Sequence, residues 1–322
     1  MYFIAAIILV LLFIKIYQKM TLGVCTSDDK MDSKVVIVTG SNTGIGYETA
    51  KELARRGAKV ILACRDSNKG MTAREKIIQA TGNRNVHFKV LDLASFKSVS
   101  EFADDILGSE PKLDVLVNNA GTGNVGNFLT DDELPFEVQV NHFSPFLLTM
   151  RLLPLLKRSA PSRIINVASI MHKAGKIDLE LFDKQARGAL ERTRVYSNTK
   201  LANILFTRKL SKVLHGSGVT VNCLHPGAVN TDIFRDKNIL FKFLIGIFFK
   251  TAKEGAQTSI YLAVADELKD TSGKYYSDCK EKRPSPHAED DKMADKLWQL
   301  SYNVVKKRID IEIEDAKMEK LA

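Results

Sequence analysis

Tyr196 and Lys200 are two residues of the sequence that can exchange a proton with a substrate. They lie four residues apart in a run whose apolar residues keep a helical spacing as far as Leu210, so both side chains are expected on one helix face, one turn apart. A phenol has a pKa of about 10, and a neighbouring ammonium group favours the phenolate and brings that pKa closer to working pH. Taken alone, the spacing is also typical of a solvated helix face, so the assignment depends on other residues.

A glycine-rich turn near the N-terminus indicates where a phosphate binds. Residues 35–38 are apolar β-formers, and Gly40, Gly44 and Gly46 follow before a helix-forming run. Gly40 allows the turn, Gly44 lets the backbone approach a pyrophosphate, and Gly46 lets helix and strand pack, while the free N–H groups of the helix start face the anion. The spacing differs from the general dinucleotide fingerprint, and an unrelated turn is the alternative.

The end of the next expected strand, residues 59–63, selects the cofactor. NAD-binding proteins carry an acid there that accepts hydrogen bonds from the adenosine ribose 2′-hydroxyl, whereas here Cys64 is followed by Arg65. Without the carboxylate nothing repels a 2′-phosphate, and a guanidinium binds phosphate through a charge-assisted fork. The sequence therefore predicts NADP(H), with a solvated loop role for Arg65 as the alternative.

These residues and several further motifs occur in the order and at the approximate distances seen in short-chain dehydrogenases/reductases, which the chain resembles from Gly23 to Val305. The motifs are residues 39–46, Asn118-Asn-Ala-Gly121, Asn141, Ser169, Tyr196-Ser-Asn-Thr-Lys200 and Pro226-Gly227. Within that family the chain is most similar to the microsomal retinol dehydrogenases that work as retinal reductases. This closer likeness is carried by Ala63-Cys-Arg-Asp66, Asn166-Val-Ala-Ser169, residues 251–258 and residues 272–280.

The resemblance implies an α/β fold with a single Rossmann-type, doubly wound parallel sheet of about seven strands. Hydrophobic patterning places strands at residues 35–38, 59–63, 86–90, 113–117, 163–168, 219–224 and near 274–276. Helices are expected over residues 74–80, 136–156, 254–265, around Tyr196 and through Trp298 to Val305. Ligands in such sheets bind outside the carboxyl ends of the strands, and Ser169 directly follows the fifth strand.

The resemblance also implies roles for individual residues. Catalysis is expected from Asn141, Ser169, Tyr196 and Lys200, and Ser169 is expected to contact the substrate. Cofactor binding is expected from Gly40, Ser41, Asn42, Thr43, Gly44, Ile45, Gly46, Arg65, Asp92, Asn118, Ala120, Gly121, Tyr196, Lys200, Pro226, Gly227 and Thr231. No metal ligand is expected.

Two of these assignments have alternatives. Asp92 resembles the family's adenine-contacting acid, but an Asp that caps a helix beginning near Ser95 would look the same in sequence. Residues 118–121 are as consistent with a tie between neighbouring strands as with ligand contact. The stretch 122–124, Thr-Gly-Asn, lacks the apolar pair common after this motif in close relatives. The sequence therefore does not determine which side chains form the pocket wall there.

Asn141 shares the expected helix 136–156 with Pro145. Proline inside a helix removes one hydrogen bond and frees a carbonyl nearby. In the family the matching asparagine lies at such an irregularity, and its main chain holds a water that relays protons to the catalytic lysine. The resemblance therefore implies the same relay toward Lys200.

Two segments are expected to shape the substrate end. Residues 171–193 lengthen the usual separation between serine and tyrosine, as in retinol dehydrogenases, and are expected at the substrate mouth. Residues 239–249 are rich in phenylalanine but are interrupted by Lys242 and Gly246. They occupy the place of the family's substrate lid and predict an apolar wall that also dips into a membrane surface.

The composition fits one α/β domain in a reducing compartment. The chain has 322 residues, 45% of them hydrophobic, a formal charge of +9 and four cysteines. These cysteines form no Cys-x-x-Cys pair, which argues against a disulfide framework or a zinc site. The positive charge suits membrane surfaces or phosphate ligands, whereas no zinc-finger or helix-turn-helix spacing points to nucleic acid.

Residues 1–14 carry no charge and are almost all apolar, and a membrane anchor over residues 1–20 is the favoured interpretation. A cleaved signal peptide would need a basic start. A buried core helix is disfavoured because the run is apolar all round and precedes the first strand of the expected fold. Lysines after the run place the catalytic domain in the cytosol, and the resemblance favours the endoplasmic reticulum over the mitochondrial membrane. A linker (21–33), the catalytic domain (34–305) and a charged tail (306–322) follow.

The resulting prediction is an NADP(H)-dependent oxidoreductase that interconverts a lipophilic alcohol and its aldehyde or ketone, first of all retinol and retinal, mainly as a reductase. The nearest alternative is a steroid or lipid-aldehyde reductase. An alternative from a different class is a catalytically silent NADP-binding membrane scaffold, although all four catalytic positions are filled as the family fills them. Oligomeric state, including a homo-oligomer, stays open.

Overall fold

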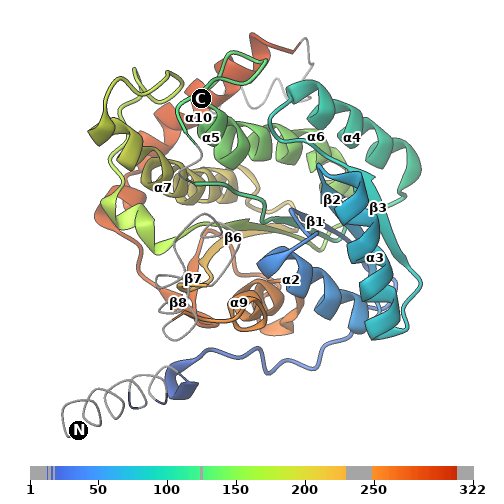
Figure 1. Cartoon of the computed structure of the whole chain (residues 1–322). Coiled ribbons are helices and arrows are strands. Elements are labelled where there is room, and N and C mark those ends of the chain that lie inside the picture. Colours follow the sequence, from blue (N-terminus) through green and yellow to red (C-terminus); the bar gives the residue numbers. More distant parts are fainter. Residues whose placement is uncertain (1–12, 14–15, 17–18, 124–125, 230–248, 310–322) are drawn as a thin grey trace, which may run out of the picture.

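One eight-stranded sheet forms the centre of the computed structural model, which describes residues 13, 16, 19–123, 126–229 and 249–309 (Figure 1). Its strands are β1 (Val35–Thr39), β2 (Lys59–Cys64), β3 (Val86–Val90), β4 (Val115–Asn118), β5 (Ser162–Val167), β6 (Val219–His225), β7 (Tyr275–Ser277) and β8 (Lys280–Lys282). They lie in the order β3-β2-β1-β4-β5-β6-β7-β8, and all pairs are parallel except β7 and β8. The predicted α/β fold is confirmed, with one strand more than predicted.

Helices cover both faces of the sheet, which explains why most strands are apolar on both sides. One face packs against α2 (Gly44–Arg55), α3 (Ser67–Thr81) and α9 (Ala252–Val264), and the other against α4 (Phe96–Ser109), α6 (Ser144–Arg158), α7 (Ala189–Val213) and α10 (Asp291–Lys306). Val36 and Val38 of β1 belong to the first core, and Val35 and Ile37 belong to the second. Short helical pieces are α5 (Phe136–Val138), η1 (Gln139–Phe143), η2 (Ile170–Ala174), η4 (Asp266–Leu268) and η5 (Pro286–Glu289).

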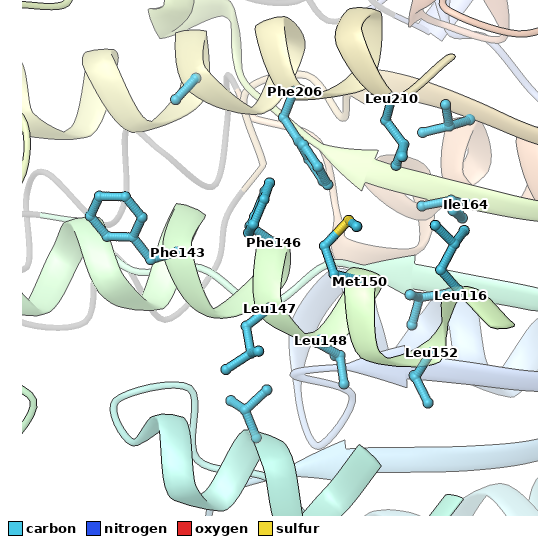
Figure 2. Close-up of a cluster of buried hydrophobic side chains, with 14 of the residues drawn as sticks. Leu116, Phe143, Phe146, Leu147, Leu148, Met150, Leu152, Ile164, Phe206 and Leu210 are labelled. Atoms are coloured by element: carbon cyan, nitrogen blue, oxygen red, sulfur yellow. The ribbon is translucent and has the colours of Figure 1, made fainter. Parts of the chain in front are cut away.

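The core between the sheet, α6 and α7 positions the helix that carries Tyr196. Figure 2 shows Phe146 and Met150 of α6 near Phe206 and Leu210 of α7. The ring centroids of Phe146 and Phe206 are 5.3 Å apart. Burial of these side chains stabilises α7 against the sheet, so the face with Tyr196 and Lys200 is held in a fixed orientation.

The strand order reverses between β1 and β4, because the chain first moves outward to β2 and β3 and then returns to the other side of β1. The helix after β1 packs on one face of the sheet, and the helices after β4 pack on the other. Connections that leave on opposite faces open a crevice at the carboxyl ends of the two strands.

The expected helix 136–156 is broken into α5, the π-helical turn η1 and α6. The Ser144 N–H donates to the Gln139 carbonyl, five residues back. Pro145 has no N–H with which to give the Asn141 carbonyl its α-helical hydrogen bond. The predicted irregularity at Asn141 is therefore confirmed, and it takes the form of a π-turn.

β8 is the strand that the sequence does not predict. Its three residues are charged and exposed, so hydrophobic alternation is missing. Asp278 and Cys279 join it to β7 with φ angles of 54° and 55°, the pair of positive angles that a type I′ hairpin turn requires. Aspartate is common in such turns and cysteine is not, so the sequence carries a weak turn signal.

The described residues of the expected linker lie along the catalytic domain. The Gly23 N–H donates to Asp278 Oδ1 (3.5 Å), and the Cys25 N–H donates to Gln257 Oε1 (3.1 Å). Of the expected anchor only residues 13, 16, 19 and 20 are described, and Thr231, residues 239–248 and residues 310–322 lie outside the described residues. No helix in the described ranges has both the length and the apolar character needed to cross a bilayer.

The buried His142 predicts a pH dependence of stability. Its ring is 1% exposed and lies edge-on to Phe143 and Phe182, with Nε2 2.8 Å from Ser301 Oγ. Burial lowers the pKa of His142 from 6.5 to about 4, so between these values only the unfolded chain takes up the proton. The free energy of unfolding is therefore expected to fall by about 3 kcal/mol as the pH falls through this window.

The matched variant is His142→Phe, which should lack this part of the pH dependence because phenylalanine does not titrate. Ser301 keeps its hydrogen bond to the Leu297 carbonyl in the variant. Urea unfolding of both proteins between about pH 7 and pH 4.5 measures the difference. Parallel curves of stability against pH would contradict the assignment.

Candidate active site

A cavity of about 730 Å³ occupies the crevice at the carboxyl ends of β1, β4, β5 and β6. Most of the predicted site residues line it: Gly40, Asn42, Thr43, Gly44, Ile45, Gly46, Arg65, Asp92, Ala120, Gly121, Ser169, Tyr196, Lys200, Pro226 and Gly227. Ser41, Asn118 and Asn141 do not line it, and Thr231 lies outside the described residues. The fold therefore brings together residues from most of the length of the catalytic domain.

The glycine loop forms one wall of the cavity. Gly40 has φ +64°, and a Cβ there would stand 2.9 Å from the Ala120 Cα. A Cβ on Gly46 would stand 2.4 Å from the Gly40 carbonyl oxygen and from Asn119 Nδ2. Both positions thus require glycine, and they let the N-terminus of α2 open onto the cavity, where its N–H groups can meet an anion.

Ser41, predicted to contact the cofactor, lies beneath this loop. Its side chain is fully buried and its hydroxyl donates to the Val38 carbonyl (2.8 Å). Its oxygen is also 3.5 Å from Cys64 Sγ. The side chain therefore ties the start of the loop to the ends of β1 and β2.

The paired asparagines after β4 have different roles. Asn118 is buried, and its Nδ2 donates to Thr149 Oγ1 (3.0 Å) and Asn166 Oδ1 (2.9 Å). This is the tie between neighbouring elements that the sequence left as an alternative. Asn119, which the prediction omitted, lines the cavity and donates from Nδ2 to the Thr39 carbonyl (2.8 Å). The sequence could have indicated this role, because Asn119 lies in the same motif as the predicted Asn118, Ala120 and Gly121.

The cavity has a cationic end at the start of α3. Arg65 is exposed and lines the cavity, as does Lys69, one helical turn further on. Asp66 Oδ1 accepts the Lys69 N–H (3.0 Å) and caps α3. Cys64, which stands where NAD-binding proteins carry an acid, is buried against Ser41. Lys69 was missed by the sequence analysis, although its place in the first turn of α3, shortly after Arg65, was the signal.

Asp92 lines the cavity and does not cap α4. Its Oδ1 accepts the Ala94 N–H (2.9 Å), whereas the helix cap is Ser95, whose Oγ accepts the Ser98 N–H (3.2 Å). The capping alternative for Asp92 is therefore wrong, and Asp92 forms part of the cavity wall.

Ser169, Tyr196 and Lys200 meet at the centre of the cavity wall. Ser169 Oγ accepts the Met171 N–H (3.2 Å) and is hydrogen-bonded to the Tyr196 side chain. Lys200 Nζ lies 5.6 Å from the centroid of the Tyr196 ring and donates to the Val167 carbonyl (3.1 Å). The serine oxygen accepts from a backbone N–H, so its own proton can be donated toward the Tyr196 oxygen or to an acceptor bound beside it.

Burial dominates the electrostatics of these groups. It lowers the pKa of Lys200 from 10.5 to about 8, and the carboxylate of Glu137 acts in the opposite direction. Burial also raises the pKa of Tyr196, with a smaller lowering by the hydrogen bond to Ser169. The Tyr196 pKa is therefore raised rather than lowered as expected from Lys200, because burial is the largest cause and the Glu137 carboxylate adds to it.

Glu137 is a further acid that the sequence analysis did not single out. It is 7% exposed on α5, four residues before Asn141, and its charge acts on both Lys200 and Tyr196. A glutamate near the start of a helix has many explanations in sequence, so only the packing of α5 on α7 shows that it faces this site.

Asn141 connects the loop after β4 to α7, the helix that carries Lys200. Its Oδ1 accepts the Thr122 N–H (2.8 Å), and its Nδ2 donates to the Thr122 carbonyl (2.7 Å) and to Thr199 Oγ1 (3.1 Å). The side chain is thus fully engaged with the loop after β4 and with α7. A Cβ on Gly121 would stand 3.1 Å from Lys200 Nζ, so the glycine leaves room for the ammonium group.

Another part of the cavity wall is apolar, although Thr122 and His225 also line the cavity. The apolar side chains come from Phe136, Val140, Ile170, Met171 and Phe249. Ile170 and Met171 are 42% and 44% exposed, which leaves an apolar surface beside Ser169 that a lipophilic molecule could cover.

The comparisons with known proteins establish the class. The profile of the short chain dehydrogenase family matches residues 34–239. The chain belongs to the short-chain dehydrogenase/reductase family and is an oxidoreductase.

Among curated proteins the chain is similar to retinol dehydrogenases. It is 46% identical to retinol dehydrogenase 12 of Homo sapiens over 285 residues, covering 88% of this chain and 90% of that protein. It is 47% identical to retinol dehydrogenase 13 of Mus musculus over 291 residues, covering 88% and 87%.

Solved structures share the fold. A crystal structure of an uncharacterised protein from Mycobacterium paratuberculosis matches with a TM-score of 0.72 and 32% identity, covering 88% of this chain and 98% of that one. A short chain dehydrogenase from Escherichia coli CFT073 complexed with NADPH matches with a TM-score of 0.63 and 25% identity, covering 79% and 100%.

Replacing Tyr196 with phenylalanine tests the proton donor. Tyr196→Phe removes only the hydroxyl, so the turnover number for a carbonyl substrate is expected to fall by about 10²- to 10⁴-fold. Cofactor affinity, measured by fluorescence titration, should change little because the ring remains. A variant that keeps full turnover would refute the assignment.

The Lys200 pKa predicts the alkaline limb of the pH profile. Turnover is expected to fall above a pH of about 8, where Lys200 loses its proton. Glu137→Gln should move this limb to lower pH, because the carboxylate stabilises the ammonium group. Glu101→Gln, on the exposed side of α4, is the control. An alkaline limb that does not move in Glu137→Gln would contradict the coupling.

Proposed function

We propose that the protein is an NADPH-dependent reductase of lipophilic aldehydes and ketones, with all-trans-retinal as the leading substrate. The observation that supports this most is that one cavity has cations in one part of its wall, Arg65 and Lys69, and apolar side chains in another, Ile170 and Met171. Tyr196 lines the same cavity. A dinucleotide phosphate needs the first part, and a lipophilic carbonyl compound needs the second.

The residues present fit an NADP(H) molecule. The glycine loop leaves no space for Cβ atoms at Gly40 and Gly46, and α2 opens its N-terminus there, which suits a pyrophosphate. Arg65 and Lys69 would hold the 2′-phosphate. Asp66 accepts the Lys69 N–H with Oδ1, and its Oδ2 lies 3.5 Å from Lys69 Nζ, an exposed ion pair that a phosphate would have to compete with. Asp92 would contact the adenosine half, and Pro226 and Gly227 would cover the nicotinamide half.

Bound NADPH supplies the hydride, and the protein's own groups manage the carbonyl oxygen. Ser169 would donate a hydrogen bond to this oxygen, where negative charge grows in the transition state. Tyr196 would donate the proton. Its raised pKa keeps the phenol protonated at neutral pH, which favours the reductive direction. Lys200 would hold the cofactor ribose, and the backbone of Asn141 would order a water that returns the proton.

The substrate proposal depends on the apolar wall and on the relatives. Ile170, Met171 and Phe136 offer surface that suits a polyene or a comparable lipid, and the relatives above are named as retinol dehydrogenases. We include in the proposal the N-terminal anchor of residues 1–20, a location at the endoplasmic reticulum membrane, and a catalytic domain that faces the cytosol.

NADPH oxidation by detergent-solubilised full-length protein tests the proposal. All-trans-retinal, a steroid ketone and a medium-chain aldehyde are compared, each with NADPH and with NADH. Rapid turnover of retinal with NADPH supports the whole proposal. Turnover of the other carbonyls alone would move the substrate class to steroids or lipid aldehydes, and NADPH binding without any turnover would favour a silent scaffold.

Arg65→Ala tests the cofactor preference. Loss of a charge-assisted hydrogen bond to phosphate costs about 1.5–3 kcal/mol, so kcat/KM with NADPH is expected to fall by about 10- to 100-fold while the value with NADH stays within about twofold. Arg84→Ala, an exposed arginine outside the cavity lining, is the control. An unchanged ratio of the two cofactors in Arg65→Ala would assign Arg65 to a solvated loop.

A further inference from the structure

The peptide unit that joins Ser169 to Ile170 is held at both ends by histidine side chains. The Ser169 carbonyl accepts two hydrogen bonds from His172, one from the backbone N–H (3.1 Å) and one from Nδ1 (2.7 Å). The Ile170 N–H donates to Nδ1 of His225 (3.1 Å). One imidazole comes from η2 and the other from the end of β6, so two separate elements fix one peptide plane.

His172 also connects the Ser169–Ile170 peptide unit to the C-terminal part of the chain. Its Nε2 accepts the Ser285 N–H (3.0 Å), a contact between residues 113 positions apart. A nitrogen that accepts carries no proton, so the proton of the neutral ring is on Nδ1, where it is donated to the Ser169 carbonyl. The side chain is fully buried, and its ring packs edge-on to Tyr275 at 5.1 Å.

The two imidazoles must be neutral to make these bonds, and their surroundings keep them so. Burial lowers the pKa of His225 to about 4, with Lys250 and Lys173 adding to the effect and Asp278 opposing it. Burial also lowers the pKa of His172, again with Lys173 adding, while its bond to Ser169 opposes the shift. At neutral pH each ring therefore presents an accepting nitrogen.

The orientation of this peptide unit decides where the Ser169 hydroxyl lies. Ser169 is the N-cap of η2, two residues after the end of β5, and its backbone is extended at φ −157° and ψ 158°. A rotation of the following peptide would move the Met171 N–H away from Ser169 Oγ and would carry the hydroxyl away from Tyr196. Small displacements of a group that contacts the reacting atoms cost large factors in rate, on the order of 10²-fold for 1 Å.

We propose that His172 and His225 are positioning residues, which clamp the Ser169–Ile170 peptide unit and thereby aim the Ser169 hydroxyl at the substrate oxygen. The inference rests on the function proposed for Ser169. It assigns to these histidines no contact with the reacting atoms and no proton transfer. Their effect reaches the reaction only through the serine.

A double-mutant cycle tests whether the effect passes through Ser169. His172→Leu in the wild-type background is expected to lower kcat by about 10- to 100-fold, with the dissociation constant for NADPH unchanged. In a Ser169→Ala background the same change should lower kcat by less than about threefold, because no hydroxyl remains to be positioned. Equal losses in the two backgrounds would overturn the proposal, since a general structural defect would act in both.

Milder variants keep the proposal testable if His172→Leu does not fold. His172→Asn places an amide nitrogen near the position of Nδ1 and should restore most of kcat, whereas His172→Gln places its polar atoms near Nε2 and should not. Ser285→Pro removes the N–H together with a side-chain hydroxyl that has no hydrogen-bond partner among the described residues. The φ of Ser285 is −69°, which proline accepts, and kcat should fall in the same direction. An asparagine variant no better than glutamine would contradict the clamp.

The outcomes separate this inference from the proposed function. A wild-type protein without turnover of any carbonyl compound would overturn the proposed function and the clamp together. An active wild type with equal losses in both backgrounds would overturn the clamp alone. Circular dichroism melting of each variant shows whether a loss of kcat accompanies a loss of fold.

Discussion

The buried ammonium group of Lys200 is the constraint on which the arrangement of the site depends. Removing a charge from water is costly, and the lowered pKa of about 8 expresses that cost. Several features offset it: the Val167 carbonyl accepts a hydrogen bond from Nζ, Glu137 supplies an opposite charge, and Gly121 leaves room. The π-turn follows α5, which carries Glu137, and places Asn141 against α7. The π-turn and the stabilisation of the buried Lys200 charge therefore depend on the same packing of α5 and η1 against α7.

The cavity at the reversal of strand order has two kinds of wall, which in the proposed function would receive the two reactants. Backbone N–H groups and cations near Arg65 form a polar wall, while Ile170 and Met171 form an apolar one. Ser169 lies beside both walls, since it follows the end of β5 by two residues and is the N-cap of η2. This explains why its backbone is held by side chains from distant elements rather than by a strand neighbour alone. The same sheet supports different substrates when the apolar wall changes.

Much of the fold follows from sequence, because strand and helix periodicities are local. The first six strands, the glycine loop and the helix of Tyr196 were predicted near their observed positions. The exposed, charged β8 lacks hydrophobic alternation, and the turn before it gives only a weak signal. The direction of a side chain does not follow from the sequence: Asn118 points into a buried network, whereas Asn119 points toward the cavity. The raised pKa of Tyr196 and the histidine contacts to Ser169 arise from tertiary packing, so neighbouring residues in sequence do not reveal them.

The central claim is that this cavity binds NADPH and a lipophilic carbonyl compound next to each other, so that hydride passes directly between them. The most direct measurement is a single turnover with NADPH that carries deuterium at both C4 positions of the nicotinamide, with all-trans-retinal as acceptor and mass spectrometry of the product. The account predicts retinol with one deuterium on the former aldehyde carbon, and no such product from Tyr196→Phe on the same time scale. Bound NADPH that transfers no label to retinal or to any other carbonyl compound would contradict the account.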